Sequence, residues 1–378
     1  MNAWKIWVRR WLLINIVAVF GFFSISTLIL GEFRELYSDD EILSEYDDIL
    51  LGSAITDSSL IKFKVIEQKK PKVVAIGSSR VMQFRSNYFV NKDFYTMGGT
   101  AGSLIDAEKT FARIRKSYTP EVVILGVDLW WLNPNFSHAS QLGRLDEIRE
   151  SKYKKYFQLV EFMKANAEMR NMLFHLDDIK EMDIVGKRKT VGLSAAAKSE
   201  GYRLADGSYQ YGSMLTADFK TSAELFKDTH KRLDNRNRRF EAADDIDYGE
   251  FERLKKLVRE MKEAGCHVIV FLPPFPDEIY SRMSNHDEWR FLLANFERSV
   301  KEYCAEENIQ FFDFSNVLWV GSNDDECLDG FHGSEMTYTK IVRSMLSDKI
   351  FAKYVDSDYL DYILEHPANR FQAIPLNK

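Results

Sequence analysis

The chain has 378 residues, of which 45% are hydrophobic and 29% are charged, and its formal net charge at pH 7 is -6. This length is enough for one large domain with insertions or for two smaller domains. The negative charge argues against a general nucleic-acid binder, because neutralising phosphates requires a basic surface.

The N-terminus has the pattern of a membrane anchor. Residues 1–10 form a short basic tail with Lys5, Arg9 and Arg10, and residues 11–30 contain no charged residue. A helix of this length reaches about 30 Å, the thickness of a bilayer core. The positive-inside rule then predicts a single-pass protein of the cytoplasmic (inner) membrane, with its N-terminus in the cytoplasm and the following residues on the periplasmic or extracytoplasmic side.

A cleavable signal peptide is the alternative interpretation of this segment. Its apolar core would normally be only about 7–15 residues long and would precede a small-x-small cleavage site. No clear Ala-x-Ala follows residues 11–30. We therefore favour an uncleaved anchor.

The rest of the chain divides into three predicted parts. Residues 31–70 form an acidic juxtamembrane connector, residues 71–350 form an α/β domain with an insertion at 135–247, and residues 351–378 form a C-terminal tail. We interpret the insertion as a lid or a substrate-recognition element, because long insertions in compact domains are often functional. A small structural hairpin that covers the core is the alternative.

Five short apolar runs in the α/β domain predict β-strands, at 73–76, 94–97, 122–126, 268–272 and 310–314. Helical spacing of apolar residues follows at 107–116, 251–261, 289–306 and 335–350, and the residues after the first strand suit a short helix. This alternation predicts a parallel five-stranded sheet between helices. Ligands bind at the carboxyl ends of the strands in such a sheet.

The first of these strands is followed by Gly77-Ser78-Ser79. This places Ser79 at a strand-to-helix turn, where free backbone N–H groups can stabilise an oxyanion while the hydroxyl projects above the sheet. Far downstream, Asp329 and His332 are three residues apart, so that one turn places them on the same side. His332 could then accept the proton of Ser79 while Asp329 orients the imidazole.

These motifs together resemble the SGNH (GDSL-like) hydrolase superfamily. The chain is most similar to membrane-anchored members that modify cell-envelope polysaccharides, such as the proteins of alginate O-acetylation and teichoic-acid D-alanylation. The resemblance implies a flavodoxin-like fold and a catalytic triad of Ser79, Asp329 and His332. It also implies that Gly98 or Gly99, in the turn after the second strand, supplies an N–H group to an oxyanion hole.

One position departs from the family pattern. The third block of the family ends in Gly-x-Asn-Asp and its Asn donates to the oxyanion, whereas Asp128 occupies that position here. An ionised Asp cannot donate a hydrogen bond to an anion. Three explanations remain open: Asp128 is protonated, another side chain donates in its place, or the oxyanion hole has only its two backbone donors, the N–H groups of Ser79 and of Gly98 or Gly99. The candidate replacement donors are Asn133 and the indole N–H groups of Trp130 and Trp131.

Aromatic residues are the candidate substrate-binding groups. Trp130 and Trp131 follow the third strand, and Tyr209 and Tyr211 lie in the insertion next to an Asp-Gly turn signal. Both pairs could stack on sugar rings, and core packing is the alternative for the tryptophans. No cysteine or histidine spacing suggests a zinc site, and no cofactor is expected. The three cysteines either pair in part or are buried free thiols.

We therefore expect a serine O-acyltransferase or esterase that moves an acyl group, with acetyl as the first candidate, to or from a hydroxyl of an envelope polysaccharide. The resemblance implies a membrane-bound O-acyltransferase (MBOAT) as the partner that relays the acyl group across the membrane. The alternatives are a non-catalytic glycan-binding or assembly subunit and a simple carbohydrate esterase.

Overall fold

The computed structural model describes residues 3–45, 48–53, 58–142, 152–165, 184–185, 188–216 and 220–375. The chain forms two compact units: unit 1 contains Met1–Ser58 and Arg144–Gly201, and unit 2 contains Ser59–Gly143 and Tyr202–Lys378. The predicted insertion 135–247 is thus divided between the two units. Parts of this insertion and of the predicted connector lie outside the described residues.

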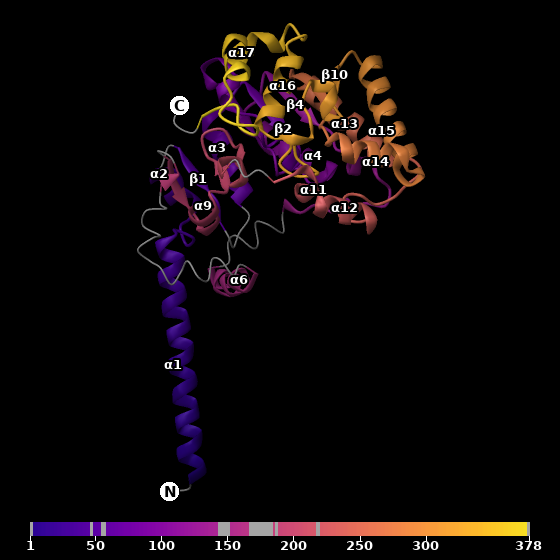
Figure 1. Ribbon diagram of the computed structural model, residues 1–378. Helices are drawn as coiled ribbons and strands as arrows, with labels where there is room; N and C mark the ends of the chain where they lie inside the picture. The colour runs from indigo at the N-terminus through magenta and orange to yellow at the C-terminus, as the bar shows by residue number, and fades with distance from the viewer. Residues whose placement is uncertain are drawn as a thin grey trace. The chain divides into compact units, whose positions relative to one another are not determined.

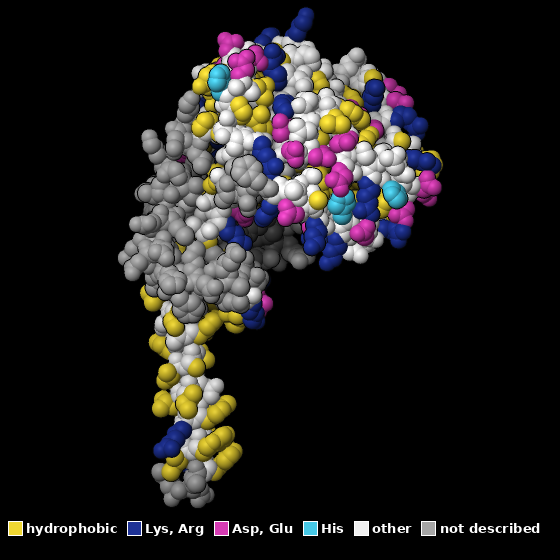
Figure 2. All heavy atoms as spheres, in the orientation of Figure 1, with side chains coloured by type: hydrophobic (Ala, Val, Ile, Leu, Met, Phe, Trp, Pro, Cys, Tyr) yellow, Lys and Arg dark blue, Asp and Glu magenta, His cyan; other side chains and the backbone are white. Residues whose placement is uncertain are grey.

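Unit 1 begins with one long helix, α1 (Ala3–Glu32), which Figure 1 draws in indigo. Among the described residues, it is the one helix that is long and apolar enough to cross a membrane, over Trp4–Glu32. Most of its large side chains are exposed, with Phe20 at 76% and Leu28 at 73%. Figure 2 shows hydrophobic side chains along its length. The structure therefore has the helix that the sequence predicted, with the length and composition of an anchor.

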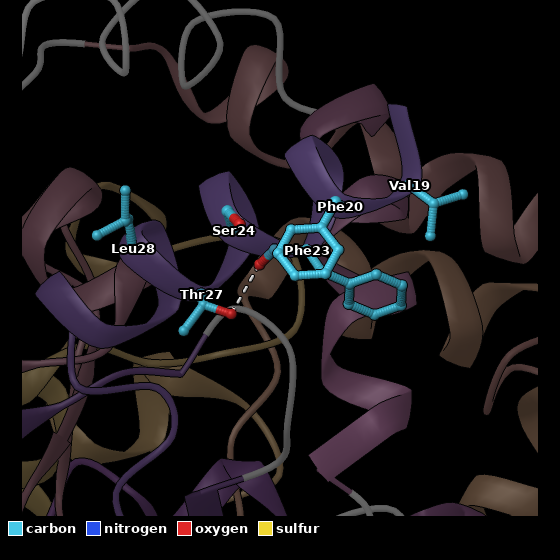
Figure 3. Close-up of a pocket in the computed structure, with 6 residues that line it drawn as sticks. All are labelled: Val19, Phe20, Phe23, Ser24, Thr27 and Leu28. Atoms are coloured by element: carbon cyan, nitrogen blue, oxygen red, sulfur yellow. Dashed lines mark hydrogen bonds between the residues drawn. The ribbon is translucent and has the colours of Figure 1, made fainter. Parts of the chain in front are cut away.

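An apolar pocket lies on the surface of α1 itself (Figure 3). The Thr27 hydroxyl donates a hydrogen bond of 2.7 Å to the carbonyl of Phe23 there. All the lining residues come from this one helix: Val19, Phe20, Phe23, Ser24, Thr27 and Leu28. The pocket contains none of the predicted site residues.

The other elements of unit 1 pack around the C-terminal end of α1. Helix α6 (Lys152–Ala165) contacts it through Tyr156, whose ring centroid is 5.3 Å from that of Phe23. Strands β5 (Ile184–Val185), β6 (Arg188–Val191) and β1 (Ile49–Leu51) lie side by side in that order. Helices α2 (Asp39–Glu45) and α9 (Leu193–Lys198) also belong to this unit, and its apolar core contains Leu30, Phe33, Leu159, Leu193 and Ala196.

Unit 2 is built on a parallel five-stranded sheet of order β10-β9-β4-β2-β3. Its strands confirm the five predicted runs: β2 (Val73–Ile76), β3 (Phe94–Thr96), β4 (Val122–Gly126), β9 (His267–Leu272) and β10 (Gln310–Asp313). Every residue of β2 and β4 is buried, as expected for a sheet covered on both faces. The order of the strands reverses direction between β2 and β4, which is where ligands bind in doubly wound sheets.

Helices cover both faces of this sheet. Alternate strand residues such as Val73, Ile124 and Phe271 join a core cluster with α16 (Glu335–Met345) and α17 (Ser357–Glu365). On the other face, α4 (Leu104–Arg115) contacts β2 and α13 (Tyr248–Glu263) contacts both α4 and β9. The other α-helices among the described residues of unit 2 are α3 (Ile61–Lys69), α10 (Ser213–Thr216), α11 (Ser222–Leu225), α12 (Lys227–Asp234), α14 (Asp277–Asn285) and α15 (Asp287–Glu306).

The prediction of a short helix after the first strand is wrong. Residues 79–92 instead form three 3₁₀ turns, η2 (Ser79–Val81), η3 (Ser86–Tyr88) and η4 (Val90–Lys92). Side chains around the whole segment are buried, including those of Arg80, Phe84 and Phe89, whereas an amphipathic helix buries one stripe. Further 3₁₀ turns are η1 (Ser58–Leu60), which begins at a residue of unit 1, and, within unit 2, η5 (Leu129–Leu132), η6 (Val317–Val320), η7 (Asp324–Glu326) and η8 (Phe351–Tyr354).

Two further regions of unit 2 bear on the predictions. The segment after residue 350, predicted as a tail, forms η8 and α17, and the N–H of Ile374 donates to Glu335 Oε1 at 2.7 Å. Strands β7 (Gly201–Arg203) and β8 (Tyr209–Gln210) are neighbours joined through a turn in which Gly207 has φ of +73°. The cysteines Cys266, Cys304 and Cys327 are all free and buried.

Close packing of glycines against Val81 fixes the turn after β2. A Cβ added to Gly77, Gly98 or Gly126 would lie 2.7, 3.0 or 2.5 Å, respectively, from a methyl group of Val81. Gly77 follows β2, Gly98 lies just after β3, and Gly126 is the last residue of β4. Three neighbouring strands thus have a glycine at the end that packs against η2.

We predict that Gly126→Ala lowers the free energy of unfolding by about 1–3 kcal/mol, because the new methyl group overpacks Val81. In a double-mutant cycle, Val81→Ala should relieve that clash, so that the double variant is less destabilised than the sum of the single variants by at least about 0.5 kcal/mol. Urea unfolding of the detergent-solubilised protein, followed by tryptophan fluorescence, measures both values.

Gly102→Ala is the control, since its Cβ would have only one neighbour, at 3.7 Å, and the expected change is within about 0.5 kcal/mol. Additive effects of Gly126→Ala and Val81→Ala would contradict this account of the packing.

Candidate active site

Ser79 is the first residue of η2 and lies directly beyond the end of β2. The hydroxyl of the preceding residue, Ser78, caps the turn by accepting a hydrogen bond of 3.2 Å from the N–H of Arg80. Ser79 is partly exposed, whereas Gly77, Ser78 and Arg80 around it are buried. The turn therefore presents one hydroxyl to solvent at the carboxyl edge of the sheet.

His332 lies beside this hydroxyl although the two residues are 253 positions apart in the chain. The distance from Ser79 Oγ to His332 Nε2 is 2.9 Å, and that from His332 Nδ1 to Asp329 Oδ2 is also 2.9 Å. Asp329 Oδ1 additionally accepts the backbone N–H groups of Phe331 and His332, each at 2.7 Å. One carboxylate thus holds both the loop and the imidazole.

The protonation states of Asp329 and His332 follow from the hydrogen-bond donors and acceptors around them. Partial burial works against ionisation of Asp329, but the attraction of His332 and the hydrogen bonds outweigh it, so the pKa of Asp329 is lowered. An ionised Asp329 can only accept, which places a proton on His332 Nδ1 and leaves Nε2 to accept the Ser79 proton. This arrangement suits a general base acting on a serine nucleophile.

The two glycines of the predicted oxyanion hole differ in their hydrogen bonds. The N–H of Gly98 donates to Thr96 Oγ1 at 3.0 Å, and its carbonyl accepts from Lys62 Nζ at 2.6 Å. Gly99 has φ of +87°, a conformation that favours glycine, and its N–H has no hydrogen-bond partner within the described part of the chain. The Gly99 N–H is thus the more available donor.

Asp128, the candidate oxyanion-hole residue, is fully buried in an ion pair with Arg80. Its Oδ1 accepts a hydrogen bond of 3.2 Å from Arg80 Nη1. The same guanidinium donates a hydrogen bond of 2.5 Å to the carbonyl of Pro273, and its carbon lies 3.8 Å from the ring centroid of Phe275. Burial raises the pKa of Asp128, and the attraction of Arg80 opposes this effect. The interaction of Asp128 in the structure is therefore with a cation beneath the serine turn.

The other candidate oxyanion donors differ in availability. The Asn133 side chain donates to the carbonyl of Glu241 at 2.6 Å, and Trp130 Nε1 donates to the carbonyl of Gly102 at 3.2 Å. Trp131 Nε1 has no partner among the described residues. Both tryptophans are fully buried, so neither offers a ring face to a glycan in this structure.

Tyr211 lies next to His332, Tyr209 lies next to Tyr211, and both tyrosines are half-buried. The ring centroid of Tyr211 is 5.8 Å from that of His332, and the rings of Tyr209 and Tyr211 are 4.7 Å apart. Tyr202 continues this row at 5.0 Å from Tyr209. The hairpin that carries them is fixed by Asp206, whose Oδ2 is 3.2 Å from Arg85 Nε.

Two residues of this region, Arg80 and Arg239, are not among the predicted site residues. Arg80 follows Ser79 directly, and Arg239 belongs to a basic run at 236–239. The sequence signal for Arg80 was an arginine beside a candidate nucleophile, but nothing local pairs it with Asp128. Among the described residues, no group of three or more His, Cys, Asp or Glu could hold a metal ion.

Comparison with protein-family models and with curated proteins gives no match for this chain. The functional argument therefore depends on the residues and their geometry.

We predict that Asp128→Asn destabilises the protein by about 3–5 kcal/mol, because it leaves the buried Arg80 without its counter-charge. Urea unfolding gives this value, and the exposed Asp325→Asn, which also removes one carboxylate, serves as control with an expected change within about 0.5 kcal/mol. Equal stability of Asp128→Asn and the wild type would show that the ion pair is not the reason for an acid at this position.

Proposed function

We propose that the chain is a membrane-anchored serine O-acyltransferase or esterase of the SGNH hydrolase type. The observation that carries the proposal is the row Asp329–His332–Ser79, with 2.9 Å at each of its two junctions. The position of Ser79 at the point where the strand order reverses is a second support. The order of the strands is that of flavodoxin-like sheets, in keeping with this superfamily.

In the proposed reaction, Ser79 Oγ bonds to the carbonyl carbon of an acyl donor while its proton moves to His332 Nε2. The N–H groups of Ser79 and Gly99 stabilise the oxyanion of the tetrahedral intermediate. The leaving group departs with the proton from His332, which leaves an ester on Ser79. An acceptor hydroxyl then gives its proton to His332 Nε2 and attacks the ester, and Ser79 takes that proton back as it is released.

The substrate and the location are part of the same proposal. The acceptor is a hydroxyl of an extracytoplasmic envelope polysaccharide, and the first candidate for the acyl group is acetyl. The half-buried ring of Tyr211 beside His332, with Tyr209 next to it, supports a sugar acceptor, since aromatic faces bind sugar rings. Lys5, Arg9 and Arg10 before the apolar stretch of α1 support a cytoplasmic N-terminus, and a membrane-bound O-acyltransferase would supply the acyl group.

One observation favours a second candidate function, a non-catalytic glycan-binding subunit. Asp128 replaces the Asn that donates to the oxyanion in the family and is bonded to Arg80. Loss of one oxyanion donor typically costs about 100- to 1000-fold in rate. A protein of this type would retain the fold and bind the glycan without forming an ester on Ser79.

We predict that a fluorophosphonate probe labels Ser79 in the full-length, detergent-solubilised protein. Ser79→Ala should abolish labelling, and His332→Ala should slow it by about 100- to 10,000-fold through loss of the base. Peptide mapping by mass spectrometry identifies the labelled residue.

The matched controls for this experiment are Ser347→Ala and His366→Ala, which change exposed residues of the same kinds and should label at the wild-type rate. Absence of labelling in a folded wild-type protein, or labelling that does not depend on His332, would reject the acyltransferase proposal in favour of the binding subunit.

A further inference from the structure

Three arginines surround the residue next to the catalytic histidine. The guanidinium carbons of Arg80, Arg232 and Arg239 lie 5.4, 5.9 and 5.6 Å from the ring centroid of Phe331. The ring of Phe331 is itself 5.1 Å from that of His332. Positive charge is therefore concentrated one side chain away from the proposed base.

Two of these three charges are neutralised within the protein. Arg80 is paired with Asp128 at 3.2 Å, and the Nε of Arg232 donates to Asp228 at 2.7 Å. No carboxylate of the described residues lies within 4 Å of the Arg239 guanidinium, which covers the ring of Trp130 at 4.9 Å. Arg239 is half-buried, so water only partly compensates its charge.

The backbone around Arg239 is held in an unusual conformation. Arg239 has φ of +83°, and Arg236 and Arg238 in the same run have φ of +50° and +55°. Such values are unfavourable for residues with a Cβ, and they persist where the surroundings impose them, often at ligand sites. Here they direct the side chain of Arg239 onto Trp130 and Phe331, whereas the side chain of Arg238 is 64% exposed.

The electrostatics around Arg239 favour a negatively charged ligand. Burial lowers the pKa of Arg239, Asp128 opposes this effect, and the like charges of Arg232 and Arg80 add to it. A guanidinium remains charged at neutral pH despite such effects. A planar, partly desolvated guanidinium binds a carboxylate or a phosphate in a charge-assisted, bidentate manner.

We infer that Arg239 binds an anionic group of the acyl acceptor, a carboxylate or a phosphate, and so selects an acidic polysaccharide over a neutral one. The identification of this ligand as the acceptor rests on the proposed function. The chain as a whole has a formal net charge of -6, so these arginines are a local concentration of positive charge on an acidic protein. Arg239 thus acts as a specificity residue beside the triad.

The test is isothermal titration calorimetry on the full-length protein in detergent. The three ligands are tetragalacturonate, a short poly(glycerol phosphate) and neutral cellotetraose, so that carboxylate and phosphate sources are distinguished. We expect the wild type to bind one of the anionic ligands and Arg239→Gln to bind it at least about 10-fold more weakly, as for the loss of a charged hydrogen bond. Arg239→Lys should recover part of the affinity.

Arg238→Gln is the matched control, because it removes an arginine with positive φ from the same segment, where it is exposed and lies 3.5 Å from Asp228. Its affinity should stay within about twofold of the wild type. The inference is overturned if both substitutions weaken binding equally, if cellotetraose binds as tightly as the anionic ligands, or if the wild type binds neither anionic ligand.

Fluorophosphonate labelling of the same preparations separates this inference from the proposed function. Labelling of Ser79 without Arg239-dependent binding would reject the anion site alone. Arg239-dependent binding without labelling would reject acyl transfer and support an acidic-glycan site on a binding protein.

Discussion

The packing of Val81 against the ends of three parallel strands is the constraint on which the site depends. Gly77, Gly98 and Gly126 leave the space that the two methyl groups of Val81 fill, so the η2 turn has one position on the sheet. Ser79 begins that turn, and its hydroxyl has to meet a histidine from the other end of unit 2. A misplacement of about 1 Å can cost an enzyme about 100-fold in rate, so the proposed chemistry would require a rigid turn.

Buried charges then fix the elements around the turn. Arg80 holds Asp128 after β4 and the carbonyl of Pro273 after β9, so that one guanidinium joins the ends of two strands under Ser79. Arg85 plays a similar part a few residues later, since it binds both Asp206 in the β7–β8 hairpin and Glu335 at the start of α16. Buried ion pairs contribute little net stability, but they disfavour other arrangements of the segments that they join. Our hypothesis is that Arg80 and Arg85 are present for this reason.

Part of this could be predicted from the sequence, because it depends on local patterns. The apolar runs at Val73 and Val122 mark buried strands wherever they occur, and the alternation with helices gives a parallel sheet. The Asp-x-x-His spacing and the small residues at Ser79 likewise predict neighbours at the carboxyl edge, and the structure places Ser79 beside His332. The roles of these residues in catalysis stay predictions.

What could not be predicted depends on contacts between distant segments. Arg80 and Arg239 look like surface arginines in the sequence, yet one is fully buried and the other is directed onto Trp130. Trp130 and Trp131 had two interpretations, and burial decides for core packing only once the whole sheet is assembled. The grouping of Arg144–Gly201 with the N-terminal segment also has no local signal, because it depends on a core shared by Leu30 and Leu159.

The most direct test of the central claim is to detect the acyl-enzyme itself. The full-length protein would be mixed with p-nitrophenyl acetate, quenched in acid within seconds and digested for mass spectrometry. The account predicts an acetyl group on Ser79 in the wild type and none at this position in His332→Ala on the same time scale. The account would be contradicted if p-nitrophenol were released while Ser79 stayed unmodified. It would also be contradicted if another residue gained and lost an acetyl group at the rate of p-nitrophenol release.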